Sequence, residues 1–179
     1  MVPQLETERL IMRAWCADDF ETYAEFMADP EVARFIAPAP MTRADAWRSL
    51  AVSIGHWALR GYGTWAVTQK SDGALVGRVG MINPEGWPAL EVGWTLGQPY
   101  WGKGYATESA AAAMRYAFLT QPVDRVISSI DPENVASQKV AQRLGETRGE
   151  RDNVTIGGKD FPVDLWFITR AEWQRRNAA

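Results

Sequence analysis

The segment that most restricts how this chain can fold is the glycine-rich run GQPYWGKGYA at residues 97–106. It follows LEVGWTL, which is typical of a strand, and precedes TESAAAAMRYAFL, which is typical of a helix. A glycine-rich turn from a strand into a helix exposes backbone N–H groups at the helix N-terminus, where the helix dipole is positive. The run therefore predicts either an anion-binding loop or an ordinary tight turn.

Two nucleotide-binding motifs match this run only in part. A Walker A loop needs Ser or Thr after Gly-Lys to ligate magnesium, and Gly104 stands there. A Rossmann fingerprint needs a third glycine where the chain has Thr107. Gly102 and Gly104 still let the backbone approach an anion, and Ala106 keeps the first helical turn slim. A diphosphate held without metal fits this loop better than a magnesium nucleotide.

The remaining pattern predicts one mixed α/β domain over residues 1–179. Asp18 and Asp19 open a helix after a first strand in LETERLIMRAW, and a helical turn follows over residues 31–36. Thr42 starts a helix that ends before Gly61 or Gly63. We expect further strands over residues 63–70, 74–82, 89–96, 123–130 and 162–169, helices over 107–119 and 134–144, and a polar tail over 171–179.

Two side-chain patterns predict how these elements pack. One face of the helix after Thr42 is expected to lie in the core, and it carries Trp47, Leu50, Ile54 and Trp57. A small-residue stripe is expected to bring the later helix close to the sheet, and it consists of Ala106, Ala110, Ala113 and Ala117. Glycines inside strands indicate bulges or close backbone approach, and they are Gly77, Gly80 and Gly93.

Composition excludes several classes of function. The formal net charge of -3 argues against broad nucleic-acid binding. Cys16 and His56 are the single cysteine and histidine, which leaves no internal disulfide, no thiolate metal site and little basis for a Ser-His-Asp triad. We see no signal-peptide pattern and no apolar run of about 20 residues, so we expect a cytoplasmic protein without a membrane partner.

The segment WGKGYATE at residues 101–108 resembles the coenzyme A loop of the GNAT superfamily of N-acetyltransferases, whose pattern is Gln/Arg-x-x-Gly-x-Gly/Ala. Trp101 replaces the usual Gln or Arg, which leaves phosphate binding to backbone amides. Further segments resemble, in the same order, the branch that includes ribosomal-protein-alanine N-acetyltransferases: LETERLIMRAWCADDFETYAEFMADPEV, LEVGWTL, ENVASQKVAQRLG and DLWFITRAEW. Glu146 departs from that branch, which usually has Phe after Leu-Gly.

The resemblance implies a GNAT-like fold, a mostly antiparallel central sheet splayed into a V with helices on both faces. Acetyl-CoA would enter the V, where a bulge near Gly93 would separate the strand at 90–97 from the one at 124–130. The pantetheine arm would pair with freed backbone groups and with Asn134, and the pyrophosphate would rest on the loop amides. The implied cofactor-binding residues are Gly93, Trp94, Thr95, Gly102, Lys103, Gly104, Tyr105, Ala106, Asn134, Ser137 and Lys139.

Acyl transfer to an amine requires a group that removes the amine proton. The resemblance implies that Glu91 is this base, directly or through water, and that Ser137 protonates the leaving thiolate. The amide of Trp94 would donate to the oxyanion. Each residue also has an ordinary interpretation: Glu91 as a solvated sheet residue, Ser137 as an inert helix surface residue and Asn134 as a helix cap.

The expected function is therefore an acetyl-CoA-dependent N-acetyltransferase that acts on a primary amine by direct transfer and without metal. The alternative is a non-catalytic acyl-CoA-binding sensor on the same fold. The acceptor stays open among a protein N-terminus, an aminoglycoside-like antibiotic, a polyamine and an amino acid. Aromatic residues in the segment 47–65 and Trp87 are candidates for the wall of an acceptor cleft, and a homodimer also stays open.

Overall fold

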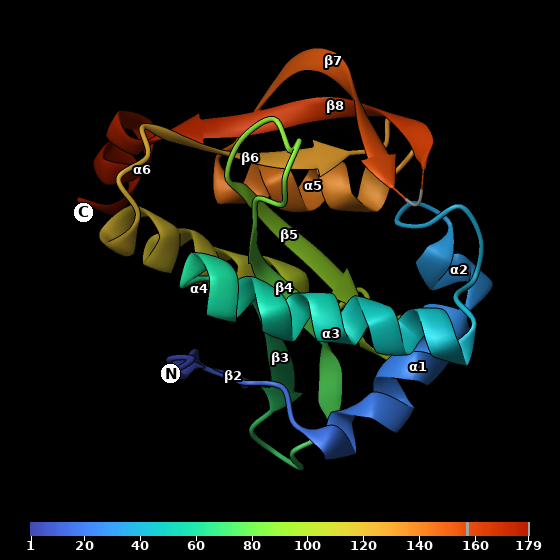
Figure 1. Cartoon of the computed structure of the whole chain (residues 1–179). Helices are drawn as coiled ribbons and strands as arrows, with labels where there is room; N and C mark the ends of the chain where they lie inside the picture. The colour runs from blue at the N-terminus through green and yellow to red at the C-terminus, as the bar shows by residue number, and fades with distance from the viewer. Residues whose placement is uncertain (157, 179) are drawn as a thin grey trace.

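The computed structural model describes residues 1–156 and 158–178, and within these ranges eight strands form one sheet (Figure 1). The strands are β1 (Leu5–Glu6), β2 (Leu10–Arg13), β3 (Thr64–Gln69), β4 (Leu75–Ile82), β5 (Glu91–Leu96), β6 (Arg125–Ile130), β7 (Thr147–Ile156) and β8 (Lys159–Thr169). Their order is β1-β2-β3-β4-β5-β6-β8-β7. Neighbours in this described sheet are antiparallel, except that β5 and β6 run parallel. The predicted mixed α/β class is confirmed.

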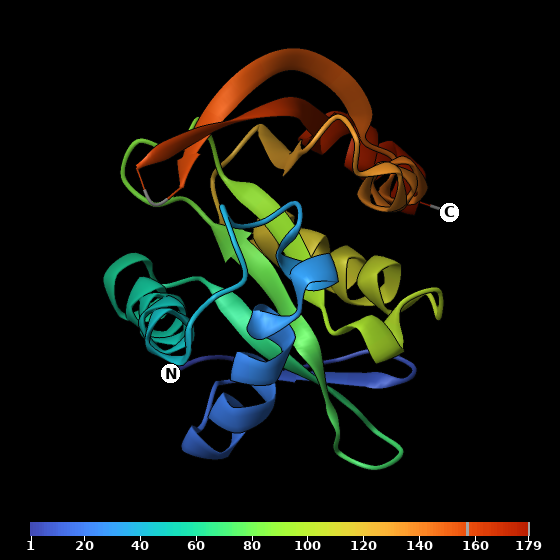
Figure 2. The ribbon, with the colours of Figure 1, turned by 90° about the vertical axis from the view of Figure 1, so that its right-hand side faces the viewer.

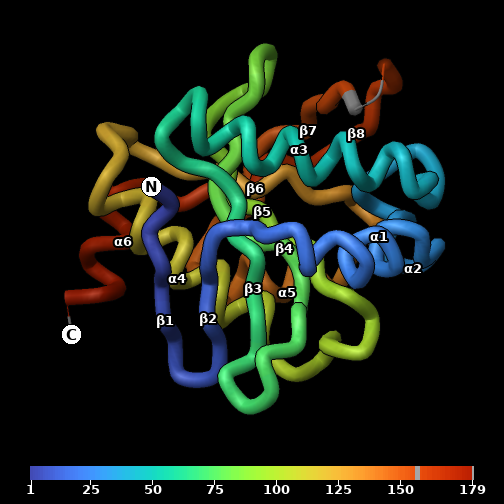
Figure 3. Tube along the Cα trace, turned by 60° about the horizontal axis from the view of Figure 1, so that its bottom comes forward, coloured from blue at the N-terminus to red at the C-terminus, as the bar shows by residue number. Residues whose placement is uncertain are grey.

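Helices cover both faces of the sheet. They are α1 (Phe20–Ala28), α2 (Pro30–Ala33), α3 (Arg43–Arg60), α4 (Tyr105–Thr120), α5 (Val135–Leu144) and α6 (Arg170–Asn177), with 3-10 turns η1 (Ala17–Asp19) and η2 (Gln98–Tyr100). Figure 2 shows α3 in teal and α4 in yellow-green on opposite faces, and Figure 3 shows β1 to β4 side by side. Within the described ranges, no helix is long and apolar enough to cross a membrane.

Small residues bring α4 against the sheet, as the alanine stripe predicts. Ala110, Ala113 and Ala117 have no exposed surface and pack in one cluster with Val79 and Val92. Alanine side chains allow close approach of a helix to a strand surface without a cavity. This packing fixes the start of α4 beside the end of β5, because η2 and a few loop residues are all that join the two elements.

The sheet opens between β5 and β6. Six consecutive pairs join β4 to β5, from Gly77↔Leu96 to Ile82↔Glu91, whereas the register of β5 with β6 contains the pair Glu91↔Ile127 alone among described residues. In Figure 1, β5 slopes away from β6 beyond this point. The predicted V is therefore present, but the predicted bulge at Gly93 is wrong. Gly93 pairs in regular register with Gly80, and the gap arises because the β5–β6 ladder ends.

Gly77 and Gly80 mark close backbone approach, as their positions inside a strand predict. A Cβ atom on Gly77 would lie 2.3 Å from the carbonyl oxygen of Thr95, and one on Gly80 would lie 2.4 Å from that of Gly63. Any side chain at either position would push β4 away from a neighbouring segment.

The predicted core face of α3 is partly wrong. Leu50 is buried and Trp57 is half-buried, but the exposed fractions of Trp47 and Ile54 are 59% and 50%. The buried stripe of α3 instead runs through Ala46, Leu50, Ser53 and His56. Small and polar residues fill it because α3 packs closely against α1 and β3. Trp47 packs edge-on against Phe20 at the rim, with 5.1 Å between ring centroids.

Two elements at the C-terminal end were not predicted. Residues 171–179 were expected to be a polar tail, but Thr169 and Glu172 form a capping box that starts α6, and residue 179 lies outside the described residues. The strand β7 has a polar sequence, TRGERDNVTI, without alternation. It forms because β8 offers an antiparallel partner along nearly its whole length.

Candidate active site

Every second residue of β5 turns its backbone N–H and C=O groups toward β6 and the gap. The carbonyl of Leu90 accepts from the N–H of Ile127 at 3.0 Å, and that of Val92 accepts from the hydroxyl of Ser128 at 2.7 Å. Successive residues of a strand point their N–H and C=O to opposite edges. Trp94 therefore turns its N–H and C=O toward the open edge, whereas Gly93 and Thr95 turn theirs toward β4. The predicted backbone contacts of Gly93 and Thr95 with a ligand in the gap are wrong for this reason.

The loop before α4 presents a group of backbone amides. Gly102 and Gly104 have φ of 72° and 82°, and Gly104 is the N-cap of α4. Within the described chain, no hydrogen bond takes up the N–H groups of residues 102 to 106. These N–H groups lie at the positive end of a 16-residue helix, the arrangement that binds phosphate in other folds.

Arg9, which sequence reasoning missed, holds this loop from the β1–β2 turn. Its Nη1 donates to the carbonyl of Lys103 at 2.9 Å, and its Nε donates to Glu108 Oε2 at 2.7 Å. The guanidinium also lies 4.7 Å from the centroid of the Tyr105 ring. Trp101 fixes the other side, because its indole N–H donates to the carbonyl of Leu96 at 2.8 Å. The loop is thus held in shape before any ligand arrives.

A cleft of about 850 Å³ runs from this loop to the gap, and we call it the donor cleft. It is lined by loop residues, by Trp94 and Thr95 of β5, and by residues of α5. Lys139 and Arg143, one helical turn apart on α5, are the cationic side chains among the described lining residues. Lys103 is not among the lining residues, and its Nζ lies over the Tyr100 ring at 5.6 Å from the centroid. Arg143 was missed, although its spacing from Lys139 was a usable signal.

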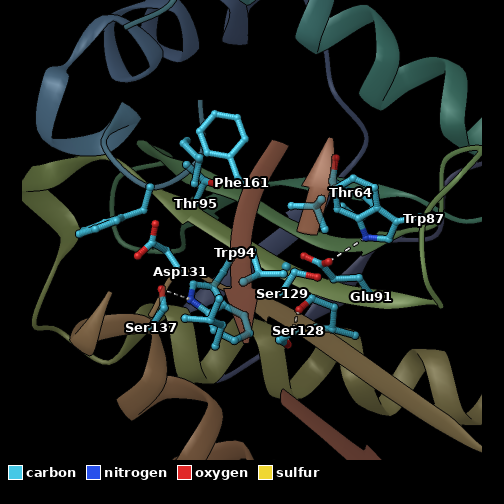
Figure 4. Close-up of a pocket in the computed structure, with 18 of the residues that line it drawn as sticks. Thr64, Trp87, Glu91, Trp94, Thr95, Ser128, Ser129, Asp131, Ser137 and Phe161 are labelled. Atoms are coloured by element: carbon cyan, nitrogen blue, oxygen red, sulfur yellow. Dashed lines mark hydrogen bonds between the residues drawn. The ribbon is translucent and has the colours of Figure 1, made fainter. Parts of the chain in front are cut away.

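Asn134 and Ser137 meet Trp94 at the inner end of the donor cleft. Asn134 caps α5, since its Oδ1 accepts from the N–H of Ser137 at 3.0 Å. That bond leaves the Nδ2 hydrogens of Asn134 for a ligand. The indole N–H of Trp94 donates to Ser137 Oγ at 3.2 Å, the dashed line at lower left in Figure 4. Because the hydroxyl accepts this bond, its own hydrogen is available to another acceptor.

Glu91 is a buried carboxyl, not a solvated sheet residue. Its exposed fraction is 7%, and burial raises its pKa above the ordinary value. Hydrogen bonding from Ser129 opposes this rise most, followed by the indole N–H of Trp87, which donates to Oε2 at 2.8 Å, and then by the positive charge of Arg78. A Cβ atom on Gly93 would lie 3.3 Å from Glu91 Oε1, so the glycine leaves room for the carboxyl beside the gap.

Glu91 lies in a second hollow of about 250 Å³, which we call the acceptor pocket. Figure 4 shows its labelled lining residues, among them Thr64, Trp87 and Phe161. Trp94, Thr95, Asn134 and Ser137 line both the acceptor pocket and the donor cleft, so the hollows adjoin there. Of the aromatic residues predicted for an acceptor wall, Trp87 lines the pocket, whereas Trp47, Trp57 and Trp65 are not among its lining residues.

His56 lines the acceptor pocket, but both of its ring nitrogens are engaged. Its Nε2 accepts from the N–H of Asn83 at 3.0 Å, and Nδ1 lies 2.7 Å from the carbonyl of Tyr62. Because Nε2 accepts, Nδ1 carries the hydrogen that is donated to Tyr62. His56 therefore links α3 to the loop before β3 and to the loop after β4.

A splayed sheet, an amide-rich helix start and a buried carboxyl beside the gap together define a site suited to acyl transfer. The family profile of the acetyltransferase (GNAT) domain matches residues 9–147, and the chain belongs to this GNAT acetyltransferase family. It is 30% identical to the N-acetyltransferase p20 of Bacillus licheniformis, over 94% of this chain and 97% of that protein.

Solved structures and a second relative agree with this assignment. The acetyltransferase of Agrobacterium tumefaciens str. C58 has a TM-score of 0.81 and 28% identity, covering 94% of this chain and 95% of that one. The [ribosomal protein uS5]-alanine N-acetyltransferase of Escherichia coli (strain K12) is 33% identical over 48% of this chain and 45% of its own length. The expected resemblance to that branch of the superfamily is confirmed, and the protein is an acetyltransferase.

Proposed function

We propose that the protein transfers an acetyl group from acetyl-CoA to a primary amine, directly and without metal. The observation that carries this proposal is the junction of the donor cleft and the acceptor pocket at Trp94 and Ser137, with Glu91 on the acceptor side. A thioester that reaches the junction through the cleft lies next to an amine that enters through the pocket. Such placement of two reactants is itself a large part of catalysis.

The donor cleft fits coenzyme A on its own residues. The N–H groups of Gly102, Lys103, Gly104, Tyr105 and Ala106 would hold the pyrophosphate, and the side chains of Lys139 and Arg143 would face the phosphates. The backbone of Trp94 and the side-chain amide of Asn134 would hold the pantetheine arm. Bound acetyl-CoA supplies an activated acyl group with a thiolate as leaving group.

Three residues would carry the chemistry at the junction. Glu91, as carboxylate, would take a proton from the amine nitrogen, directly or through water, as that nitrogen bonds to the acetyl carbon. The N–H of Trp94 would donate to the carbonyl oxygen as negative charge develops on it. Ser137, whose hydroxyl hydrogen is left available by Trp94, would donate to the departing sulfur. The net result is one proton moved from nitrogen to sulfur and one acetyl moved from sulfur to nitrogen.

Thiol release from acetyl-CoA in the presence of an amine panel tests this proposal. The panel would include an alanine-initiated peptide, because one relative is named for alanine N-acetylation of a ribosomal protein. We expect amine-dependent release, and a loss of roughly 10²-fold in kcat/KM in Glu91→Gln with unchanged coenzyme A affinity. Tight coenzyme A binding without release for any amine would instead support the non-catalytic acyl-CoA sensor.

A further inference from the structure

The acceptor pocket is lined by the backbone of Gly93 between two charged side chains, Arg78 and Glu91. On β4 and β5, the pairs Arg78↔Thr95, Gly80↔Gly93 and Ile82↔Glu91 follow one another on the same face of the sheet. The middle pair consists of two glycines, so no side chain rises between Arg78 and Glu91. A guanidinium thus lies on one side of this glycine pair and a carboxyl on the other, and both line the same pocket.

Arg78 reaches this pocket without a carboxylate partner among the described residues. Both of its hydrogen bonds start from Nη1 and end on hydroxyl oxygens, Tyr23 Oη at 3.2 Å and Ser49 Oγ at 3.3 Å. Its Nη2 and Nε hydrogens form the fork with which arginine binds carboxylates. The charge of Arg78 lowers the pKa of Glu91 against the larger effect of burial, yet no ion pair joins these two described side chains.

A buried hydroxyl group along the pocket, that of Thr64, also lacks a partner among the described residues. Thr64 has an exposed fraction of 6%, lines the pocket and stands opposite Gly80, yet its Oγ1 has no hydrogen-bond partner within the described chain. Buried polar atoms are nearly always satisfied, so the hydroxyl of Thr64 points to a polar ligand that completes it.

From these groups we propose that the acceptor is a small amine that also carries a carboxylate, an amino-acid-like molecule. Its carboxylate binds the fork of Arg78, its amine faces Glu91, and its small body lies over Gly93 beside Thr64. The proposal rests on the proposed acetyl transfer and names the substrate class of that site. It separates this protein from acetyltransferases whose acceptor is a plain amine or polyamine.

Pocket size and charge agree with this class of acceptor. Pockets for drug-sized ligands usually span about 300–1,000 Å³, and this pocket, at about 250 Å³, suits a smaller molecule. The charged side chains that line it are Arg78, Glu91 and Asp131. Asp131 lies beside Ser137 at the junction (Figure 4) and accepts from the N–H of Glu133 at 2.7 Å. A polyamine leaves the guanidinium of Arg78 without an anionic partner, whereas an amino acid offers a group to both Arg78 and Glu91.

Matched acceptors and Arg78 variants test the proposal. The acceptors are amino acids with the amine at the α, β or γ position. Each is compared with its carboxamide and with the amine that remains when the carboxylate is removed. Rates are measured at saturating acetyl-CoA and at a pH at which Glu91 is ionised. We expect kcat/KM for at least one carboxylate-bearing member to exceed its neutral partners by about tenfold or more. Arg78→Met should raise KM for that acceptor far more than for its neutral partners and so bring the ratio near one, and Arg78→Lys should restore part of the preference.

Tyr23→Phe is the control for a merely structural role, because it removes a hydroxyl that Arg78 contacts but keeps the guanidinium. It should keep the carboxylate preference. Neutral amines acetylated as well as amino acids by the unmodified protein, or a Tyr23→Phe effect equal to that of Arg78→Met, would overturn the proposal and leave acetyl transfer intact. Absence of turnover with every amine despite coenzyme A binding would overturn both proposals.

Discussion

The hydroxyl of Ser128 lies between two oxygen atoms, 2.9 Å from Glu146 Oε1 and 2.7 Å from the carbonyl oxygen of Val92. A hydroxyl has one hydrogen, so both contacts are satisfied only if Ser128 donates to Val92 and a protonated Glu146 donates to Ser128. Glu146 has an exposed fraction of 5%, and burial raises its pKa to about 8. The residue that departs from the family pattern is thus a buried acid behind the opening of the sheet.

Glu146 should make the free energy of unfolding depend on pH. Between the ordinary pKa of 4.5 and about 8 the unfolded chain releases this proton, whereas the native state keeps it. The native state then binds more protons, so stability is complete below pH 4.5 and falls as pH rises, by up to about 1.4 kcal/mol per pH unit. Urea unfolding at pH 5 to 8 checks this against Glu146→Gln, a neutral side chain of the same shape. Parallel stability curves for the two proteins would contradict the assignment.

Trp87 should help, together with Ser129, to set the pH at which catalysis begins. Glu91 must lose its proton to act as a base, and burial raises its pKa, so kcat/KM should fall as pH drops through a value above the ordinary range of glutamate. Trp87→Phe removes the N–H that favours the carboxylate. The acidic limb of the pH profile should move to higher pH in this variant while the plateau rate changes little. An unmoved limb would mean that a different group titrates.

Ser137→Ala should lower the rate of the chemical step without weakening coenzyme A binding. The hydroxyl is held by the indole of Trp94 and donates to the departing sulfur in the proposed mechanism. Because a thiolate leaves readily, we expect a loss of about tenfold in kcat, which is smaller than the usual effect of removing a general acid or base. Single-turnover kinetics with acetyl-CoA and calorimetry with coenzyme A separate the two effects. Trp94→Phe, which keeps the backbone N–H, should lose less than Ser137→Ala.

The sequence predicted the local features of the site better than its long-range contacts. Gly102 and Gly104 have the positive φ that a glycine-rich turn before a helix requires, and the strand before them is present. Arg9 holds Lys103 across 94 residues of chain, and no local pattern contains such a contact. The backbone groups of residues 93–95 face either β4 or the gap, depending on the hydrogen-bond register of β5 with its neighbours. Side-chain alternation does not determine this register in a strand with buried residues on both faces.

The strand β7 and the face of α3 could not be read for a related reason. Polar residues form β7 because β8 lies beside them, and Trp47 is exposed because it lies outside the buried stripe of α3. In both cases tertiary packing overrides local propensity. The role of Glu146 was likewise hidden, since the sequence showed a departure from the family pattern but not the hydroxyl of Ser128 that receives it.

Coenzyme A affinity of Gly104→Val, measured by calorimetry, tests the central claim most directly. A β-branched residue disfavours φ of 82°, and its Cβ would lie 3.3 Å from Arg9 Nη2, so the loop amides would leave their shared direction. Gly73→Val is the matched control, since Gly73 has φ of 75° in a turn that lines neither hollow. We predict that Gly104→Val, while still folded, weakens coenzyme A binding by about 10- to 100-fold, and that Gly73→Val leaves binding unchanged. Equal affinity in Gly104→Val and the unmodified protein would contradict the account.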